Sequence, residues 1–283
     1  MAYDKDIYIT KDLPGHQSSN VYDAVSNTFI GNVWYETNRS QMILTPDILT
    51  ALGFETGDII KQVGFIFGFL TSGGRTNIED MKIRMGHTTQ SAFTSPFDFI
   101  SATGLTECFF ADVPFSSLDS SYLNATVKDW ATNTTFALNE LAIYTTTGVY
   151  YKSLVSSNKG HNPTTSPSQW EVYSWNMFTL TTPFTWNGTN NLIIDLERVD
   201  NDWADDSASG VELVPLLSPY NNGSIRILGS CGDGNSSPVP YGTGVGYYDT
   251  YDTGTNRLYN VRFSVDSAEG GVTYNATMFG VAI

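Results

Sequence analysis

The stretch WNMFTLTTPFTWNGTNNLIIDL, residues 175–196, decides the fold class of this chain. Its first part, Trp175–Leu180, alternates apolar and polar residues, as a strand with one buried face does. Pro183–Asn191 contains a proline and an Asn-Gly pair and predicts a turn, and Leu192–Leu196 then reads as a short strand of the core. The stretch therefore predicts two strands joined by a turn.

Short strands separated by turns continue on both sides of this stretch. Asp58–Leu70 is apolar enough to be buried on nearly both faces, whereas Asn77–His87 alternates and keeps one wet face. Residues 45–47, Thr-Pro-Asp, precede a short helix that ends at Gly53. Phe184 and Trp186 are expected to pack in the core. Further strands are expected within Phe29–Leu44, Phe97–Ile100, Leu105–Val113, Val211–Leu217, Ser224–Leu228, Leu258–Val265 and Thr273–Val281. The sequence thus predicts an all-β, jelly-roll-like β-sandwich.

The composition agrees with this fold class. Apolar residues make up 41% of the chain and charged residues only 15%, and the many aromatic and β-branched residues suit strands. The net charge of −15, without a Lys/Arg cluster, argues against nucleic acid as a partner. The first residues lack the pattern of a secretory signal and no apolar run is long enough to span a membrane, so we expect a soluble chain made in the cytoplasm, with no membrane insertion.

Residues 130–173 interrupt the pattern with a small aromatic module. A hairpin is predicted between residues 136 and 155, and a turn-rich connector then returns a tryptophan to the sheet. A unit of this size has little core, so Trp130, Tyr151 and Trp170 must supply much of its buried area.

The sandwich motifs resume at Trp175 as though nothing intervened, which indicates an insertion. We therefore predict an N-terminal arm (residues 1–28), a discontinuous β-sandwich domain (residues 29–123 and 174–283) and an inserted module (residues 124–173). The arm can equally be a frayed terminus.

Four runs of the sandwich resemble the jelly-roll adhesin-like domains of Bacteroidetes surface proteins and of similar phage proteins. The runs are SQMILTPDILTALGFETGDIIKQVGFIFG, IEDMKIRMGHTTQSAF, WNMFTLTTPFTWNGTNNLIIDL and RLYNVRFSV. The resemblance covers roughly residues 30–115 and 174–266, and it implies a fold more than a function.

The insert is similar to the small carbohydrate-binding modules of chitinases, grouped as families five and twelve, and to the version found in phage structural proteins. The matching positions are Gly148, Tyr151, Ser153, Asn158, Gly160, Pro163, Ser166, Pro167 and Trp170. This resemblance implies that the module binds host-surface glycans by stacking sugar rings on exposed aromatic side chains.

The candidate glycan-binding residues are Tyr150, His161 and Trp170. Tyr150 points to the strand face opposite Tyr151 and is the preferred exposed platform, and His161 could add a polar contact. Trp170 matches a position that usually belongs to the family's small core. The alternative is a module that serves only as a spacer or as a contact for another protein.

Asp200, Asp202 and Asp205 lie in the run VDNDWADDSASG and could supply oxygen ligands to Ca²⁺. Their spacing does not match the twelve-residue calcium loop, so an exposed acidic loop is the alternative. Apart from calcium, no cofactor is expected. The spacing indicates neither a Ser-His-Asp set nor a pair of glycosidase carboxylates, so no catalytic residue is expected. Cys108 and Cys231 are expected to be buried free thiols rather than a disulfide.

Together these features predict a non-enzymatic structural protein of a bacteriophage virion, made in the host cytoplasm. It would serve as a head decoration, a fibre or a tail accessory and would present the module to host-surface or extracellular polysaccharide. Other virion proteins and further copies of the chain are the expected partners, because symmetry multiplies weak contacts. The alternatives are a bacterial surface adhesin or polysaccharide-binding protein, and a glycan-active enzyme with an appended module.

Overall fold

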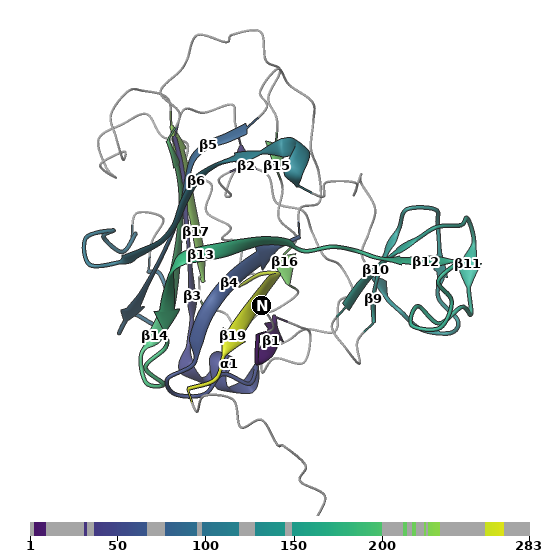
Figure 1. Cartoon of the computed structure of the whole chain (residues 1–283), viewed down its shortest axis with the longest axis horizontal. Coiled ribbons are helices and arrows are strands. Elements are labelled where there is room, and N and C mark those ends of the chain that lie inside the picture. Colours follow the sequence, from purple (N-terminus) through teal and green to yellow (C-terminus); the bar gives the residue numbers. More distant parts are fainter. Residues whose placement is uncertain are drawn as a thin grey trace, which may run out of the picture.

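Over the residues that it describes, the computed structural model shows an all-β protein with one short α-helix, which confirms the predicted all-β class. Two antiparallel sheets pack face to face as a sandwich, and a smaller group of strands projects from one side (Figure 1). The structure describes residues 3–9, 31–32, 37–66, 77–94, 98–118, 128–144, 149–199, 212–213, 217–218, 224, 226–232 and 258–268.

Within the described residues, nine strands form the two sheets of the sandwich. The first sheet has the order β1 (Lys5–Tyr8), β19 (Val261–Asp266), β4 (Ile59–Phe65) and β13 (Asn176–Thr185). The second has the order β17 (Ile227–Gly232), β3 (Thr37–Leu44), β14 (Asn191–Val199), β5 (Asn77–Thr88) and β6 (Thr106–Pro114).

The strand pairs of the sandwich are nested along the chain. Leaving β17 aside, the first strand pairs with the last, β3 with β14, β4 with β13, and β5 with β6, all antiparallel. The pairs β19–β4 and β14–β5 complete the two sheets, and β17 extends the second sheet beside β3.

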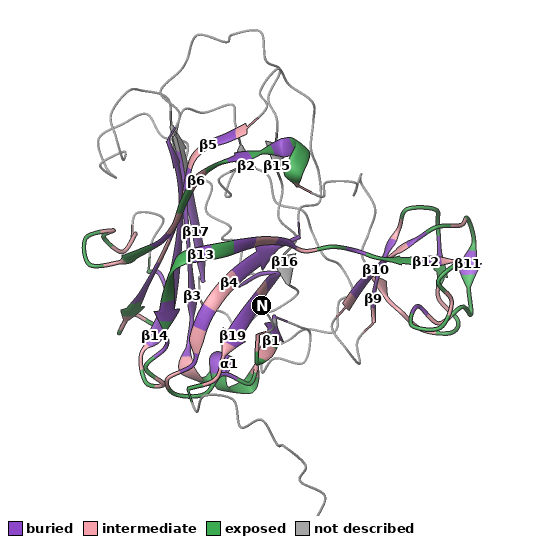
Figure 2. Cartoon of the chain, in the orientation of Figure 1, coloured by how far each residue is buried: buried purple, intermediate pink, exposed green. Residues whose placement is uncertain are grey.

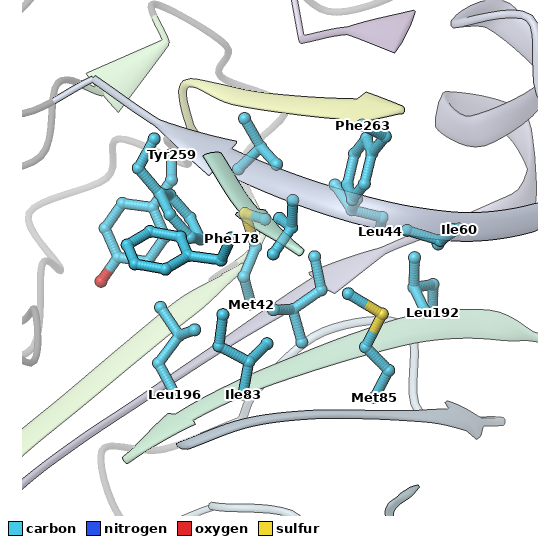
Figure 3. Packing of buried hydrophobic residues seen from close by; sticks show 14 of the residues in the cluster. Met42, Leu44, Ile60, Ile83, Met85, Phe178, Leu192, Leu196, Tyr259 and Phe263 are labelled. Carbon is cyan, nitrogen blue, oxygen red and sulfur yellow. The ribbon is translucent and has the colours of Figure 1, made fainter. Parts of the chain in front are cut away.

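The core fills the space between the sheets with side chains from alternate positions of each strand. In β5, Met81, Ile83 and Met85 are completely buried while the residues between them are partly exposed, as the predicted alternation requires. Figure 3 shows side chains of the first sheet meeting those of the second, among them Ile60, Phe178 and Phe263 on one side and Met42, Leu44, Ile83, Met85, Leu192 and Leu196 on the other.

The two strands and the turn predicted in residues 175–196 are confirmed in part. Phe184 and Trp186 are buried in the core, and Asn187 closes a turn by accepting backbone N–H bonds from Thr189 and Asn190. The turn does not begin at Pro183, however, because β13 continues to residue 185. A register shift between residues 179 and 184 accommodates the proline, which has no N–H to donate to a ladder.

The predicted short helix is confirmed as α1 (Pro46–Ala51), which starts on its proline and buries Ile48 and Leu49. Gly53 follows it with a φ of +96°, a conformation that glycine adopts without strain. Smaller elements are the 3-10 turn η1 (Phe115–Ser117) and the two-residue strands β2 (Gly31–Asn32), β15 (Glu212–Leu213), β16 (Leu217–Ser218) and β18 (Leu258–Tyr259).

Two predictions about the sandwich are wrong. Residues 98–100 form no strand; Phe99 and Ile100 instead pack on the outer face of the second sheet, beside Ile43 and Ile193. The predicted arm, residues 1–28, includes strand β1, because Ile7 and Ile9 lie on the same side of the chain and are buried in the core. Residues 10–28 lie outside the described part of the chain, as does the strand expected within residues 273–281.

The insert forms its own small sheets between β6 and β13. A sheet of order β12-β10-β9-β7 lies beside a two-stranded sheet of β11 and β8. Their bounds are β7 (Lys128–Asp129), β8 (Thr135–Phe136), β9 (Leu141–Tyr144), β10 (Val149–Ser153), β11 (Asn158–Lys159) and β12 (Trp170–Val172). Figure 2 shows buried residues along the sandwich strands and many exposed residues at the end of the insert around β11.

Candidate functional site

The four-stranded sheet of the insert is covered on both faces. Tyr150 pairs with Ile143 and Tyr151 with Ala142, so the two tyrosines lie on opposite faces, as the sequence predicted. On one face Tyr150, Ile143 and Tyr173 pack against Ile66, which follows β4 of the sandwich. The insert is therefore docked on the sandwich through this face.

This docking corrects the prediction that Tyr150 is an exposed platform. Tyr150 is only 1% exposed, and its ring meets Trp175 edge to face with the centroids 5.7 Å apart. The face of the sheet that carries Tyr150 is not a free surface, because the sandwich covers it. Tyr150 thus holds the module in place and has no face left for stacking on a sugar.

The other face carries the module's own core, as predicted. Tyr151 and Trp170 are buried there with Phe136, and Trp130 packs partly buried against them. The rings of Phe136 and Trp170 meet edge to face at 5.0 Å. Since Trp170 is only 3% exposed, its candidate glycan-binding role is wrong and its role in the core is confirmed.

His161 contributes to the module through its backbone. Its carbonyl oxygen accepts a hydrogen bond from the indole N–H of Trp130 and another from that of Trp170, both at 2.9 Å. Two buried or half-buried indole donors are satisfied at one acceptor, which ties the connector to the core. The side chain of His161 is exposed and remains a candidate polar contact.

One pair of aromatic side chains on the module stays accessible. Trp130 and Tyr144 are half-buried, and their ring centroids lie 5.4 Å apart with the planes inclined at 53°. Asn162 places its amide 3.4 Å from the Tyr144 hydroxyl, and Thr164 holds the Asn162 side chain by donating to its oxygen from both backbone and hydroxyl. Two rings with an oriented amide beside them can contact the apolar face and the hydroxyls of a sugar.

The sequence did not single out this pair because the contact depends on a minimal strand. Two residue pairs join β7 to β9 in parallel, and the backbone N–H of Trp130 donates to the Ile143 carbonyl. A two-residue strand leaves no periodic pattern in the sequence. The one available signal was that Tyr144 lies two positions from Ala142, on the face that carries Tyr151.

A cluster of charged side chains lies on the outer face of the second sheet. Asp195 is completely buried and accepts hydrogen bonds from Arg39 at 2.5 Å, Arg84 at 2.8 Å and Gln41 at 2.8 Å. Arg84 also binds both oxygens of Glu197, at 3.0 and 2.9 Å. We name these five residues the ion-pair ladder.

The charges of the ion-pair ladder are mutually compensated. Burial alone would raise the pKa of Glu197, but the hydrogen bond and charge of Arg84 outweigh it and hold this pKa below its ordinary value. Burial likewise opposes the charge of Arg84, yet its carboxylate partners raise its pKa. A carboxyl group held ionised by a guanidinium is a poor proton donor, so the ladder is suited to joining β3, β14 and β5 rather than to general acid catalysis.

The remaining predicted site residues are placed as follows. Asp200, Asp202 and Asp205 lie outside the described residues. Within the described ranges, no group of three or more His, Cys, Asp or Glu side chains could hold a metal ion.

Cys108 is a free, buried thiol, and burial raises its pKa to about 11. Among the described residues no helix is long and apolar enough to cross a membrane.

Comparison of the chain with protein-family models, with curated proteins and with solved structures finds no match.

Proposed function

We propose that the sandwich is a jelly roll and that the module is an insertion between its fifth and sixth strands. The support is the nested pairing of eight strands, which is what a rolled double-stranded ribbon produces and which gives the two four-stranded layers of a jelly roll. On this assignment β17 is an additional strand at the edge of the second layer.

We further propose that the protein is a non-enzymatic attachment protein of a phage virion, in which the sandwich is the anchor and the module contacts glycans. The observation that carries the glycan role is the accessible Trp130–Tyr144 pair beside the fixed amide of Asn162. The virion assignment rests on the resemblance of the insert to modules of phage structural proteins. The candidate surface has moved from Tyr150 to the opposite face of the same small sheet.

The glycan role is tested by calorimetric titration of the full chain with chitin oligosaccharides and with oligosaccharides from bacterial surfaces. Tyr144→Ala should weaken binding about tenfold, which corresponds to about 1.4 kcal/mol. Tyr144→Phe separates the ring from its hydroxyl and should retain most of the affinity. Phe110→Ala is the matched control, because it removes an aromatic ring that is 50% exposed on the sandwich.

Equal affinity of the wild type and Tyr144→Ala for every bound glycan would rule out the aromatic pair as the site. The virion assignment is tested separately by mass spectrometry of purified particles and by immunogold labelling. Label on a head or tail supports it. Detection only in the envelope of uninfected cells would instead establish the bacterial adhesin alternative.

A further inference from the structure

A cleft of about 450 Å³ lies at the base of the module, where β6 and β13 separate. The two strands meet further along, where the Thr181 hydroxyl donates to the Cys108 carbonyl at 3.0 Å. Beyond that contact β6 leads into η1, while the chain returns from the module at Ser174, and the two segments diverge (Figure 1). The volume falls within the range of about 300–1,000 Å³ that small-molecule sites occupy.

Two aromatic rings that line the cleft are held in place. Phe109 and Trp175 line it as half-buried rings, and Phe109 meets the buried ring of Phe178 edge to face at 5.5 Å. The ring of Trp175 meets that of the buried Tyr150 edge to face. These rings are therefore fixed before a ligand arrives, which lowers the entropic cost of binding.

The rim of the cleft is polar. Asp112, Ser117, Ser174 and Thr179 line it and are exposed. One carboxylate oxygen of Asp112 accepts the Asp80 backbone N–H at 3.0 Å, which orients the group. The Ser117 hydroxyl donates to the Pro114 carbonyl and the Thr179 hydroxyl accepts from the Gln62 amide. Ser117 can therefore still accept, and Thr179 can still donate, a hydrogen bond to a ligand hydroxyl.

The charge of the lining selects among ligands. None of the described lining residues is Lys, Arg or His, so an anionic ligand would meet Asp112 without a compensating cation, which costs affinity. A wholly apolar ligand would remove water from the Asp112 carboxylate and bring it no hydrogen-bond donor, which costs affinity. A ligand that fits has an apolar face for the rings and neutral hydroxyls for the rim.

We propose that this cleft binds a neutral saccharide, with an apolar sugar face on Phe109 and Trp175 and the sugar hydroxyls on Asp112 and the neighbouring serines. The site shares no residue with the Trp130–Tyr144 pair and does not depend on the glycan role of the module. Because Trp175 contacts both the cleft and Tyr150, a bound saccharide also adds contacts at the junction between module and sandwich.

The test is calorimetric titration of the full chain with neutral oligosaccharides of glucose, xylose, mannose and N-acetylglucosamine, with oligogalacturonate as the anionic comparison. At least one neutral oligosaccharide should bind with a Kd at or below about 1 mM, and oligogalacturonate should not bind. Ser174→Trp fills the mouth of the cleft from an exposed position and should abolish this binding. Asp112→Asn should weaken it about tenfold.

Glu107→Gln is the matched control for Asp112→Asn, because it neutralises an exposed acid on the same strand outside the cleft. Thermal unfolding checks that Ser174→Trp folds, and if it does not, Asp112→Asn against Glu107→Gln decides. The proposal is overturned if no neutral member of the panel binds, or if the cleft variants bind like the wild type. Binding that is lost in Tyr144→Ala but kept in both cleft variants would assign all saccharide binding to the module and would also overturn the cleft.

Discussion

Replacing Tyr150 by alanine should destabilise the protein by about 3–5 kcal/mol, because the ring lies between the module and the sandwich. The side chain is 1% exposed, and an aromatic side chain buries about 150–250 Å². At about 25 cal/mol per Å², this area corresponds to an upper value of about 4–6 kcal/mol. Measured truncations of buried aromatic residues cost about 3–5 kcal/mol, and the two ranges overlap.

Urea unfolding of the full chain, followed by tryptophan fluorescence, measures this loss. With a slope of about 3 kcal/mol per molar urea, the midpoint should fall by about 1–2 M. Tyr150→Phe keeps the ring and should cost less than about 1.5 kcal/mol. Tyr144→Ala removes a half-buried ring from the opposite face of the same sheet and should also cost less than Tyr150→Ala.

Hydrogen exchange locates the effect. In Tyr150→Ala the amides of β9 and β10 should lose protection more than those of β14, because the truncated contact belongs to the module. A stability loss of Tyr150→Ala below about 1 kcal/mol would refute the docked arrangement. That outcome would return Tyr150 to the exposed position that the sequence first indicated.

Two further predictions concern the sandwich. The pKa of Glu197 is lowered from its ordinary value of 4.5, so its contribution to the free energy of unfolding is complete above pH 4.5 and is lost as the pH falls through the lower pKa of the folded state. The free energy of unfolding should therefore fall less steeply with acid in Glu197→Gln than in the wild type or in the control Glu107→Gln. Identical slopes would contradict the ion-pair ladder. Gly188→Ala should lower the free energy of unfolding in urea by about 2–4 kcal/mol, since φ is +78° and a Cβ would lie 1.9 Å from the Thr56 hydroxyl oxygen. Gly53→Ala is the control and should lower it less, because φ is +96° there but the space around it is open. Equal losses of stability in the two variants would show that the contact with Thr56 relaxes at no cost.

The sandwich was predictable because its strands carry strong local patterns. The alternation in residues 77–87 reflects a strand with one buried face, and the apolar run of residues 192–196 reflects a strand buried on both faces. Both patterns are contained in neighbouring residues. The ion-pair ladder also left a signal. Asp195 and Glu197 are spaced by two on β14, and on the paired strand β5 Arg84 is spaced by two from Lys82, which lies 3.5 Å from Glu197. Opposite charges at this spacing can face each other across paired strands.

The module was harder to predict because its decisive contacts are between distant residues. Alternation correctly placed Tyr150 and Tyr151 on opposite faces, but the sequence near Tyr150 does not reveal that Ile66 and Trp175 cover it. The cleft is similarly composed of residues from β6 and from the return segment, which the whole module separates in sequence. Local patterns determine which way a side chain points, and the packing of distant elements determines what it meets.

The nested strand pairs also set an order of assembly. Lys5 pairs with Val265, so the first sheet cannot be completed until residue 266 has emerged from the ribosome, whereas β9–β10 and β5–β6 join strands that are close in sequence. Ile7 therefore has no partner strand until β19 has been synthesised, and closing so long a loop is slow. During that interval the β1 segment of one chain can pair with β19 of a neighbouring chain, so crowded synthesis favours exchange of this strand between copies.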